Sequence, residues 1–138
     1  MSPTTQAADV SVVDVVLPHK VSAVADARRG LAAYLKRRAV SVEARDDAQL
    51  VLTELLSNAI RHAWPLAAGE VRAAWWLDKA GIHLEVTDGG SDTDPRRITD
   101  AHPESIGGRG LAIVEILTAE WGVRRGDGSR TVYAVVSR

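Results

Sequence analysis

Cysteine and phenylalanine are both absent from this chain of 138 residues. The lack of cysteine excludes disulfide bonds, thiol catalysis and zinc sites that are built on cysteine. Without phenylalanine, four tryptophans and two tyrosines carry all of the aromatic side chains. No apolar run approaches the ~18 residues that a membrane-spanning helix needs. We therefore expect no membrane partner.

An excess of positive charge is also missing, since the formal net charge is −1 and the sequence pI is near 6.4. Surfaces that bind nucleic acids usually carry a strong basic excess, so we expect no nucleic-acid partner. The length fits a single domain with one core. Residues 1–9 are polar and contain neither a basic leader nor an apolar signal core. We expect a disordered tail at 1–9, one domain over 10–138 and a cytoplasmic location.

The longest helical pattern covers residues 41–63, and its polar stripe contains the first candidate site residues. Glu54, Asn58 and His62 are four residues apart, and Arg61 falls on the same arc. An asparagine oxygen can bind a hard cation such as Mg²⁺, and a carboxylate one turn away can orient or deprotonate a hydroxyl. An ordinary solvated helix face is the alternative. The apolar stripe beside these residues consists of Ala48, Leu52, Leu55, Ala59 and Ala63.

Elsewhere, helical spacing and period-two alternation define the order of the other elements. The tandem Trp75-Trp76 must place one ring on each face of its strand, with one of them in the core. The order of strands and helices predicts an α+β fold, a two-layer α/β sandwich with a mixed, mostly antiparallel sheet and helices on one face. We expect strands within 10–17, 70–77 and 82–86, from 121 and at 131–136, and helices within 20–38 and 41–63 and from 111.

Two glycine motifs flank a long polar stretch. Asp88-Gly89-Gly90 ends the predicted hairpin, and Gly107-Gly108-Arg109-Gly110 precedes the last helix. Glycines at a helix start let backbone N–H groups converge on an anion, although a flexible helix entry is the alternative. Residues 91–106 between the motifs form a connection long enough to be a functional lid.

Taken in order, these motifs resemble those of the GHKL ATPase superfamily, which contains gyrase-type ATPases, Hsp90, histidine kinases and MutL. Within this superfamily, the chain is most similar to the bacterial anti-sigma factor serine kinases of the RsbW and SpoIIAB type. The segments 111–114, 121–123 and 131–133 also resemble the actinobacterial branch of that group. The resemblance covers about residues 10–137 and implies the Bergerat ATP-binding fold.

The resemblance also implies a role for each matching residue. Glu54 would be the catalytic base, and Asn58 would bind Mg²⁺. Asp88 would accept a hydrogen bond from the adenine amine, and Gly90 would let the backbone approach the base. The other positions expected to bind ATP are Arg61, His62, Gly107, Gly108, Arg109, Gly110, Leu111 and Thr131.

Three positions depart from the family pattern. Asp92 stands where a further glycine is common, and this acidic residue could weaken nucleotide binding. Arg130 replaces a usual lysine and Tyr133 a usual tryptophan, and we interpret both of these changes as mild.

The implied function is that of an ATP- and Mg²⁺-dependent protein-serine kinase which is also an anti-sigma factor. Such a protein phosphorylates a STAS-type anti-anti-sigma factor and sequesters a sigma factor, and the family suggests a homodimer. A non-catalytic ATP-binding regulatory module remains open, because binding-only relatives can keep the same residues. A detached histidine-kinase catalytic domain is the weakest alternative. None of the four histidines lies in a phosphoacceptor helix with a following acidic residue: His19, His62, His83 and His102.

Overall fold

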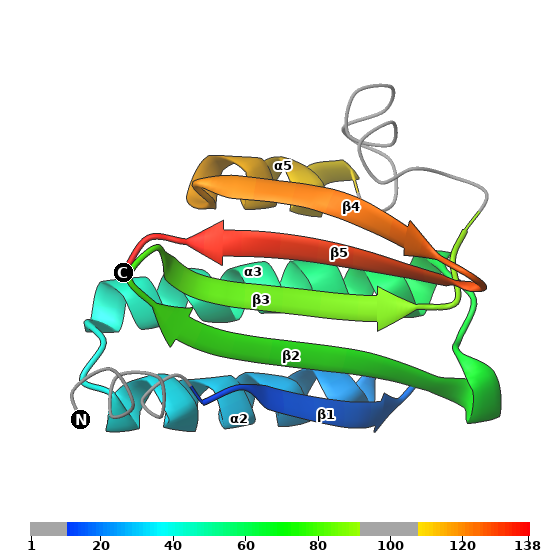
Figure 1. Ribbon diagram of the computed structural model, residues 1–138, viewed down its shortest axis with the longest axis horizontal. Coiled ribbons are helices and arrows are strands. Elements are labelled where there is room, and N and C mark those ends of the chain that lie inside the picture. The colour runs from blue at the N-terminus through cyan, green and yellow to red at the C-terminus, as the bar shows by residue number, and fades with distance from the viewer. Residues whose placement is uncertain (1–10, 92–107) are drawn as a thin grey trace, which may run out of the picture.

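The computed structural model describes residues 11–91 and 108–138. Within them, five strands form one sheet in the order β1-β2-β3-β5-β4 (Figure 1). The strands are β1 (Val13–Pro18), β2 (Glu70–Asp78), β3 (Gly81–Asp88), β4 (Glu120–Gly126) and β5 (Ser129–Val136). The helices are α2 (Ser22–Arg37), α3 (Val42–His62), the short 3-10 helix η1 (Ala67–Gly69) and α5 (Gly108–Leu117).

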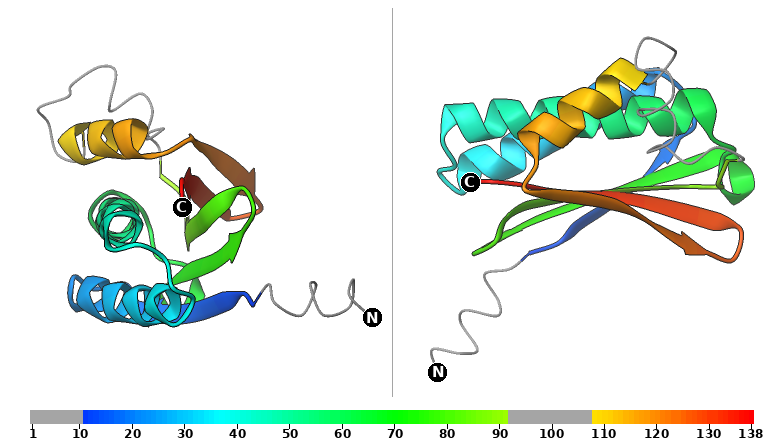
Figure 2. Two further views of the ribbon diagram at one scale, coloured as in Figure 1. Left: turned by 90° about the vertical axis from the view of Figure 1, so that its left-hand side faces the viewer. Right: turned by 90° about the horizontal axis from the view of Figure 1, so that it is seen from above.

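The sheet forms one layer, and α2, α3 and α5 lie together on one of its faces (Figure 2). The predicted two-layer α+β sandwich is thus confirmed. The expectation of a mixed sheet is wrong in detail, because all four strand pairings are antiparallel. Two tight hairpins, β2–β3 and β4–β5, each force an antiparallel pair. The hairpins join through β3 and β5, where Ile82 pairs with Val136 and Asp88 with Arg130.

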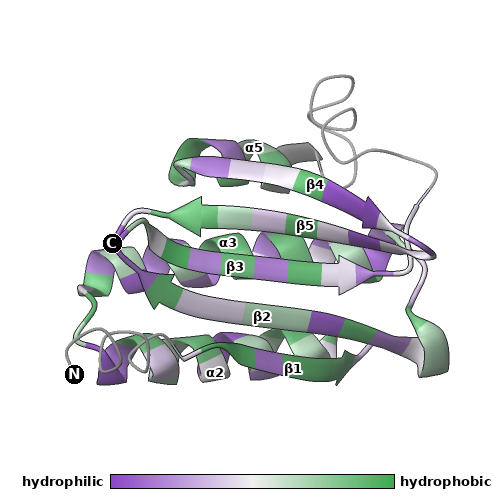
Figure 3. Ribbon diagram, in the orientation of Figure 1, coloured by the Kyte–Doolittle hydropathy of each residue, from purple (hydrophilic) through white to green (hydrophobic). Residues whose placement is uncertain are grey.

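Alternating hydropathy explains which face of each strand is covered. Hydrophobic and hydrophilic residues alternate along β3 in Figure 3, and burial alternates in the same way along β3 and β5. The predicted placement of the tandem tryptophans is confirmed. Trp75 is 2% exposed in the core, whereas Trp76 lies on the open face and stacks on His83 with ring centroids 4.9 Å apart. That face therefore carries an aromatic pair that no helix of the described residues covers.

Helix α3 starts and ends at defined side-chain contacts. The Ser41 hydroxyl accepts a hydrogen bond of 3.2 Å from the backbone N–H of Ala44, as expected for an N-cap. At the other end, His19 Nε2 lies 3.1 Å from the carbonyl oxygens of both Ala59 and Ala63. Because a carbonyl can only accept, Nε2 carries the proton and donates to the helix end. These contacts fix where the last turns of α3 lie relative to the sheet.

The apolar stripe that periodicity assigned to α3 is buried as predicted except at Ala63, which is half-buried and is the extended C-cap residue after the helix. Ala48, Leu52, Leu55 and Ala59 are all at most 1% exposed, and they pack against the helix-facing side of the sheet. The polar stripe beside them is consequently held at the edge of the helix–sheet interface. Among the described residues, no helix is long and apolar enough to cross a membrane.

We expect Ser41→Ala to lower the free energy of unfolding by about 1 kcal/mol, because the substitution leaves one N–H group of the first turn without its acceptor. Urea denaturation followed by circular dichroism measures this change. Thr53→Ala is the matched control on the same helix. Its hydroxyl donates to the carbonyl of Gln49, which the helix ladder already uses. The control should change the free energy of unfolding by less than about 0.5 kcal/mol. Equal losses in the two variants would contradict the capping role.

Candidate functional site

The candidate site lies at one end of the sandwich, on the right in Figure 1, where several elements begin or end. Helix α3 and strand β3 both finish there, and β5 and α5 both start there. The cross-strand pair of Asp88 and Arg130 closes the sheet at this end. The fold therefore brings the end of α3, which carries Asn58, to the same end of the domain as Asp88, although the two residues are about thirty positions apart in the sequence.

The polar stripe of α3 contributes two buried atoms that have no hydrogen-bond partner. Asn58 is 5% exposed, and its Oδ1 lacks a donor within the described part of the chain, as His62 Nε2 lacks a partner there. Glu54 and His62 are half-buried, and Arg61 is exposed. A buried amide oxygen without a donor is costly unless a ligand satisfies it. The Asn58 oxygen thus fits a cation ligand.

No group of three or more histidine or acidic side chains within residues 11–91 and 108–138 could hold a metal ion by itself. A magnesium ion bound at Asn58 would need most of its oxygen ligands from water and from a bound phosphate, which is the usual arrangement for Mg²⁺. The residues present therefore fit a metal that arrives together with a phosphorylated ligand.

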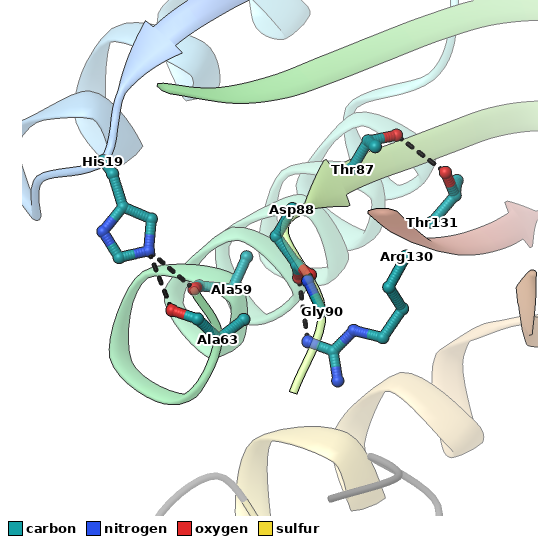
Figure 4. Close-up of polar contacts among 8 residues, drawn as sticks. All are labelled: His19, Ala59, Ala63, Thr87, Asp88, Gly90, Arg130 and Thr131. Atoms are coloured by element: carbon teal, nitrogen blue, oxygen red, sulfur yellow. Dashed lines mark hydrogen bonds and ion pairs between the residues drawn. The ribbon is translucent and has the colours of Figure 1, made fainter. Parts of the chain in front are cut away.

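Asp88, at the end of β3, is fully buried, and each of its two oxygens accepts a hydrogen bond (Figure 4). Oδ1 accepts a hydrogen bond of 2.7 Å from the backbone N–H of Gly90. Oδ2 accepts one of 2.8 Å from Nη2 of Arg130, which is itself 1% exposed. We interpreted Arg130 as a mild replacement, but in the structure it forms a buried ion pair. The alternation of Arg130 with Val132, Ala134 and Val136 was the sequence signal that it faces inward.

Thr131 does not join this group. It lies on the opposite face of the sheet from Asp88, where its Oγ1 is 2.8 Å from Oγ1 of Thr87, the residue it pairs with on β3 (Figure 4). Successive residues of a strand point to opposite faces, so Arg130 and Thr131 cannot both face the helices. The inward position at the start of β5 belongs to Arg130.

The turn after Asp88 is held against the segment that follows α3. Gly89 N–H donates to the carbonyl of Trp64 at 2.6 Å, and Trp64 N–H donates to the carbonyl of Gly90 at 2.9 Å. A Cβ at Gly89 would overlap the carbonyl oxygen of Pro65, so this position needs glycine for close approach. Gly90 has φ +93°, and a Cβ there would meet no atom within 4 Å among the described residues other than its chain neighbours. The described part of the chain therefore leaves space at Gly90, two residues after Asp88.

At the start of α5, Gly108 begins the helix and Leu111 is 1% exposed. Gly107, the side chain of Arg109 and the environment of Gly110 lie outside the described residues. So do the predicted tail at 1–9, Asp92 and the predicted lid apart from Ser91.

The family model of the histidine kinase-like ATPase domain matches residues 17–136. The chain belongs to this family. The predicted kinship with RsbW-type kinases is confirmed at a distance, while the actinobacterial branch remains a prediction.

Three relatives illustrate how far the similarity to this ATPase domain extends. Serine-protein kinase RsbW of Listeria innocua is 28% identical over 112 residues, which cover 73% of this chain and 71% of that kinase. Serine-protein kinase RsbW of Oceanobacillus iheyensis is 27% identical over 116 residues, covering 76% and 73%. The phosphate regulon sensor protein PhoR of Pseudomonas aeruginosa is 31% identical over 71 residues, which are 44% of this chain but only 16% of the sensor.

Two solved structures share the fold of the domain. The RsbU and RsbW domains of Rv1364c from Mycobacterium tuberculosis superpose with a TM-score of 0.68 at 18% identity, covering 93% of this chain and 33% of that one. The SiaB–SiaC complex from Pseudomonas aeruginosa gives 0.69 at 15% identity, covering 98% and 93%. At these identities the likeness supports the fold alone.

The electrostatics of the site act on His62. Burial lowers the pKa of its imidazole below the ordinary 6.5, and the positive charges of Arg61 and Arg130 lower it further. The folded domain therefore resists protonation of His62. Neutral His62 makes its full contribution to the free energy of unfolding above pH 6.5. This contribution is lost as the pH falls from 6.5 through the lower pKa that His62 has in the folded domain.

We expect Arg61→Gln to raise the pKa of His62 toward 6.5, because the substitution removes one of the two positive charges that act on the imidazole. Titration of the imidazole proton chemical shifts by NMR measures this. Arg29→Gln is the matched control, since Arg29 is exposed on α2 and pairs with Asp26. The control should leave the titration of His62 unchanged. A wild-type pKa at or above 6.5 would refute the electrostatic assignment.

Proposed function

We propose that this domain binds ATP with Mg²⁺ at the end of α3 and β3, with Asn58 as the metal ligand. The observation that carries this proposal is the buried Asn58 oxygen, which has no hydrogen-bond donor within the described residues. It belongs to a domain whose family is that of histidine kinase-like ATPases. The ion contributes neutralisation of phosphate charge. Membership of the family supports ATP as the ligand, and the orphaned oxygen supports the position of the metal.

Asp88 and Gly90 are suited to the base. The carboxylate of Asp88 has acceptor capacity left after its bonds to Gly90 and Arg130, because an ionised carboxylate offers about four lone-pair sites. An adenine amine can donate to one of these sites. Gly90 leaves room for the base, since no atom of the described residues other than its chain neighbours lies within 4 Å of the position that a Cβ would take.

Beyond binding, we propose phosphoryl transfer to a serine. Glu54 lies one turn before Asn58 and is half-buried, so its carboxylate can take a proton from a hydroxyl near the metal. The serine oxygen forms a bond to the γ-phosphorus while the bond from that phosphorus to the β-phosphate oxygen breaks. The serine proton passes to the Glu54 carboxylate, and ADP leaves.

Distant similarity to the RsbW serine-protein kinases supports a protein substrate. We propose that this substrate is a STAS-type anti-anti-sigma factor, and that the domain sequesters a sigma factor once its partner is phosphorylated. A regulatory module that binds ATP and a partner without transferring phosphate is the competing function, and it would keep the same Asn58 site.

Substitutions on α3 should separate binding from transfer. Asn58→Ala should remove the Mg²⁺-dependent part of ATP binding and phosphoryl transfer together, because the triphosphate loses its bridging cation. Glu54→Ala should leave ATP affinity within several-fold and lower transfer by about 10²–10⁴, the usual contribution of a positioned base. Glu43→Ala, an exposed carboxylate in the first turn of α3, is the matched control and should change neither.

Calorimetry of Mg·ATP binding and transfer of labelled phosphate to STAS proteins of the same genome are the two measurements. If the wild type binds ATP and a partner tightly but labels no partner, the kinase proposal fails and the regulatory module stands. If the wild type does not bind ATP, both fail. Transfer by Glu54→Ala at the wild-type rate would move the base elsewhere on the helix, with His62 as the next residue to test.

A further inference from the structure

Arg130 has no role in the function proposed above, yet it is among the most deeply buried side chains of the domain. We propose that Arg130 is a specificity-determining residue which, together with Asp88, reads the Watson–Crick edge of adenine. Asp88 accepts from the exocyclic amine N6, and the Arg130 guanidinium donates to the adjacent ring nitrogen N1. This inference rests on the proposed binding of ATP.

The two side chains are held as a unit by the sheet. Asp88 and Arg130 face each other across β3 and β5, on the side that the helices cover. Their exposed fractions are 0% and 1%, and Oδ2 of Asp88 lies 2.8 Å from Nη2 of Arg130. In Figure 4 the guanidinium extends from β5 toward Asp88 and Gly90. A base that reaches the Asp88 carboxylate through the open space at Gly90 therefore arrives beside the guanidinium.

Hydrogen-bond accounting indicates that the ion pair persists when the base binds. A neutral amine that replaced the Arg130 guanidinium as the partner of the Asp88 carboxylate would break a buried ion pair, which is costly. Asp88 has unused acceptor sites, and the planar guanidinium of Arg130 has five N–H groups in a fixed fork. We therefore expect the adenine amine to share the Asp88 carboxylate with Arg130 and not to displace the guanidinium from it.

Adenine presents a donor and an acceptor side by side on this edge, at N6 and N1. A carboxylate alone satisfies only the donor, and its charge repels the lone pair of N1. A guanidinium next to the carboxylate supplies the missing donor, and it remains a donor at every accessible pH. The pair of Asp88 and Arg130 thus offers an acceptor for the N6 amine and a donor for N1. If the ion pair were purely structural, the domain would bind adenine nucleotides equally well with or without a nitrogen at N1.

The test compares ATP with 1-deaza-ATP, in which carbon replaces N1, by competition calorimetry. Wild type should bind 1-deaza-ATP at least about tenfold more weakly than ATP, the scale of one hydrogen bond to a charged group. In Arg130→Met the two nucleotides should bind within about threefold of each other. The affinity of this variant for 1-deaza-ATP should match that of wild type within about threefold, since wild type has already lost the N1 contact with this nucleotide.

Arg130→Met leaves Asp88 buried without its partner, so the folded fraction is checked by thermal unfolding. Arg130→Lys is the second variant, because it keeps the charge at Asp88. Its single ammonium group, engaged on Asp88, lacks the second donor at the fixed angle of the guanidinium. Like Arg130→Met, Arg130→Lys should bind ATP and 1-deaza-ATP within about threefold of each other, and we call the wild-type difference between the two nucleotides the N1 preference. This variant decides the test if Arg130→Met does not fold. Arg124→Met removes an arginine that pairs with Glu85 and is 55% exposed, and it should keep the full N1 preference.

Equal wild-type affinity for the two nucleotides overturns the inference. So does an equal loss of affinity for both nucleotides in Arg130→Lys, or a loss of all binding in that variant, because either result assigns Arg130 a structural role only. A wild type that binds no ATP at all is a different outcome, since it refutes the proposed function itself.

Discussion

The packing of α3 against the helix-facing side of the sheet is the constraint on which the rest of this domain depends. Leu52, Leu55 and Leu56 are at most 1% exposed, and burial of each stabilises the fold by roughly 2–3 kcal/mol relative to an exposed leucine. Side chains one turn apart on a helix share a face, so fixing the leucines also fixes the stripe of Glu54 and Asn58 beside them. The candidate site is therefore a consequence of core packing.

The second constraint is the alternation of faces along a strand. Asp88 and Arg130 are one cross-strand pair, and Thr87 and Thr131 are the next, on opposite sides of the sheet. A register shift of one residue would separate both pairs and turn the side chains of one strand to the opposite face of the sheet. Replacing a buried ion pair by well-packed apolar residues is often neutral or stabilising, so stability alone does not explain why Asp88 and Arg130 are there. A substitution at Asp88 alone would break this buried ion pair and would therefore perturb folding together with any binding at the site.

Local sequence patterns predicted the parts of the fold that local physics determines. The 3.6-residue period over residues 41–63 located α3, which spans Val42–His62. The alternation within residues 70–77 and 82–86 located β2 and β3, which pair as a hairpin. The pairing of β3 with β5 joins residues more than forty positions apart, and no local pattern encodes it. That is why the sheet was expected to be mixed when it is antiparallel.

The same distinction applies to the candidate site. Asn58, Asp88 and Gly90 were assigned by resemblance, and the structure puts them at one end of the molecule. Gly89 was missed as a close-approach position, because the carbonyl of Pro65 that it must avoid comes from another part of the chain. Thr131 was assigned by its place in a motif without regard to the face of the strand. Counting residues from the buried Val132 would have placed Arg130, not Thr131, on the inner side.

Arg130 also connects the two halves of the site electrostatically. Its charge lowers the pKa of His62, so the guanidinium on β5 is close enough to be felt at the last turn of α3. The start of β5 and the last turn of α3 are thus electrostatically connected, and Arg61 adds a second positive charge that acts on His62. An anion that bound beside His62 would raise the same pKa that burial and the two arginines lower, so titration of this imidazole would report the arrival of phosphate.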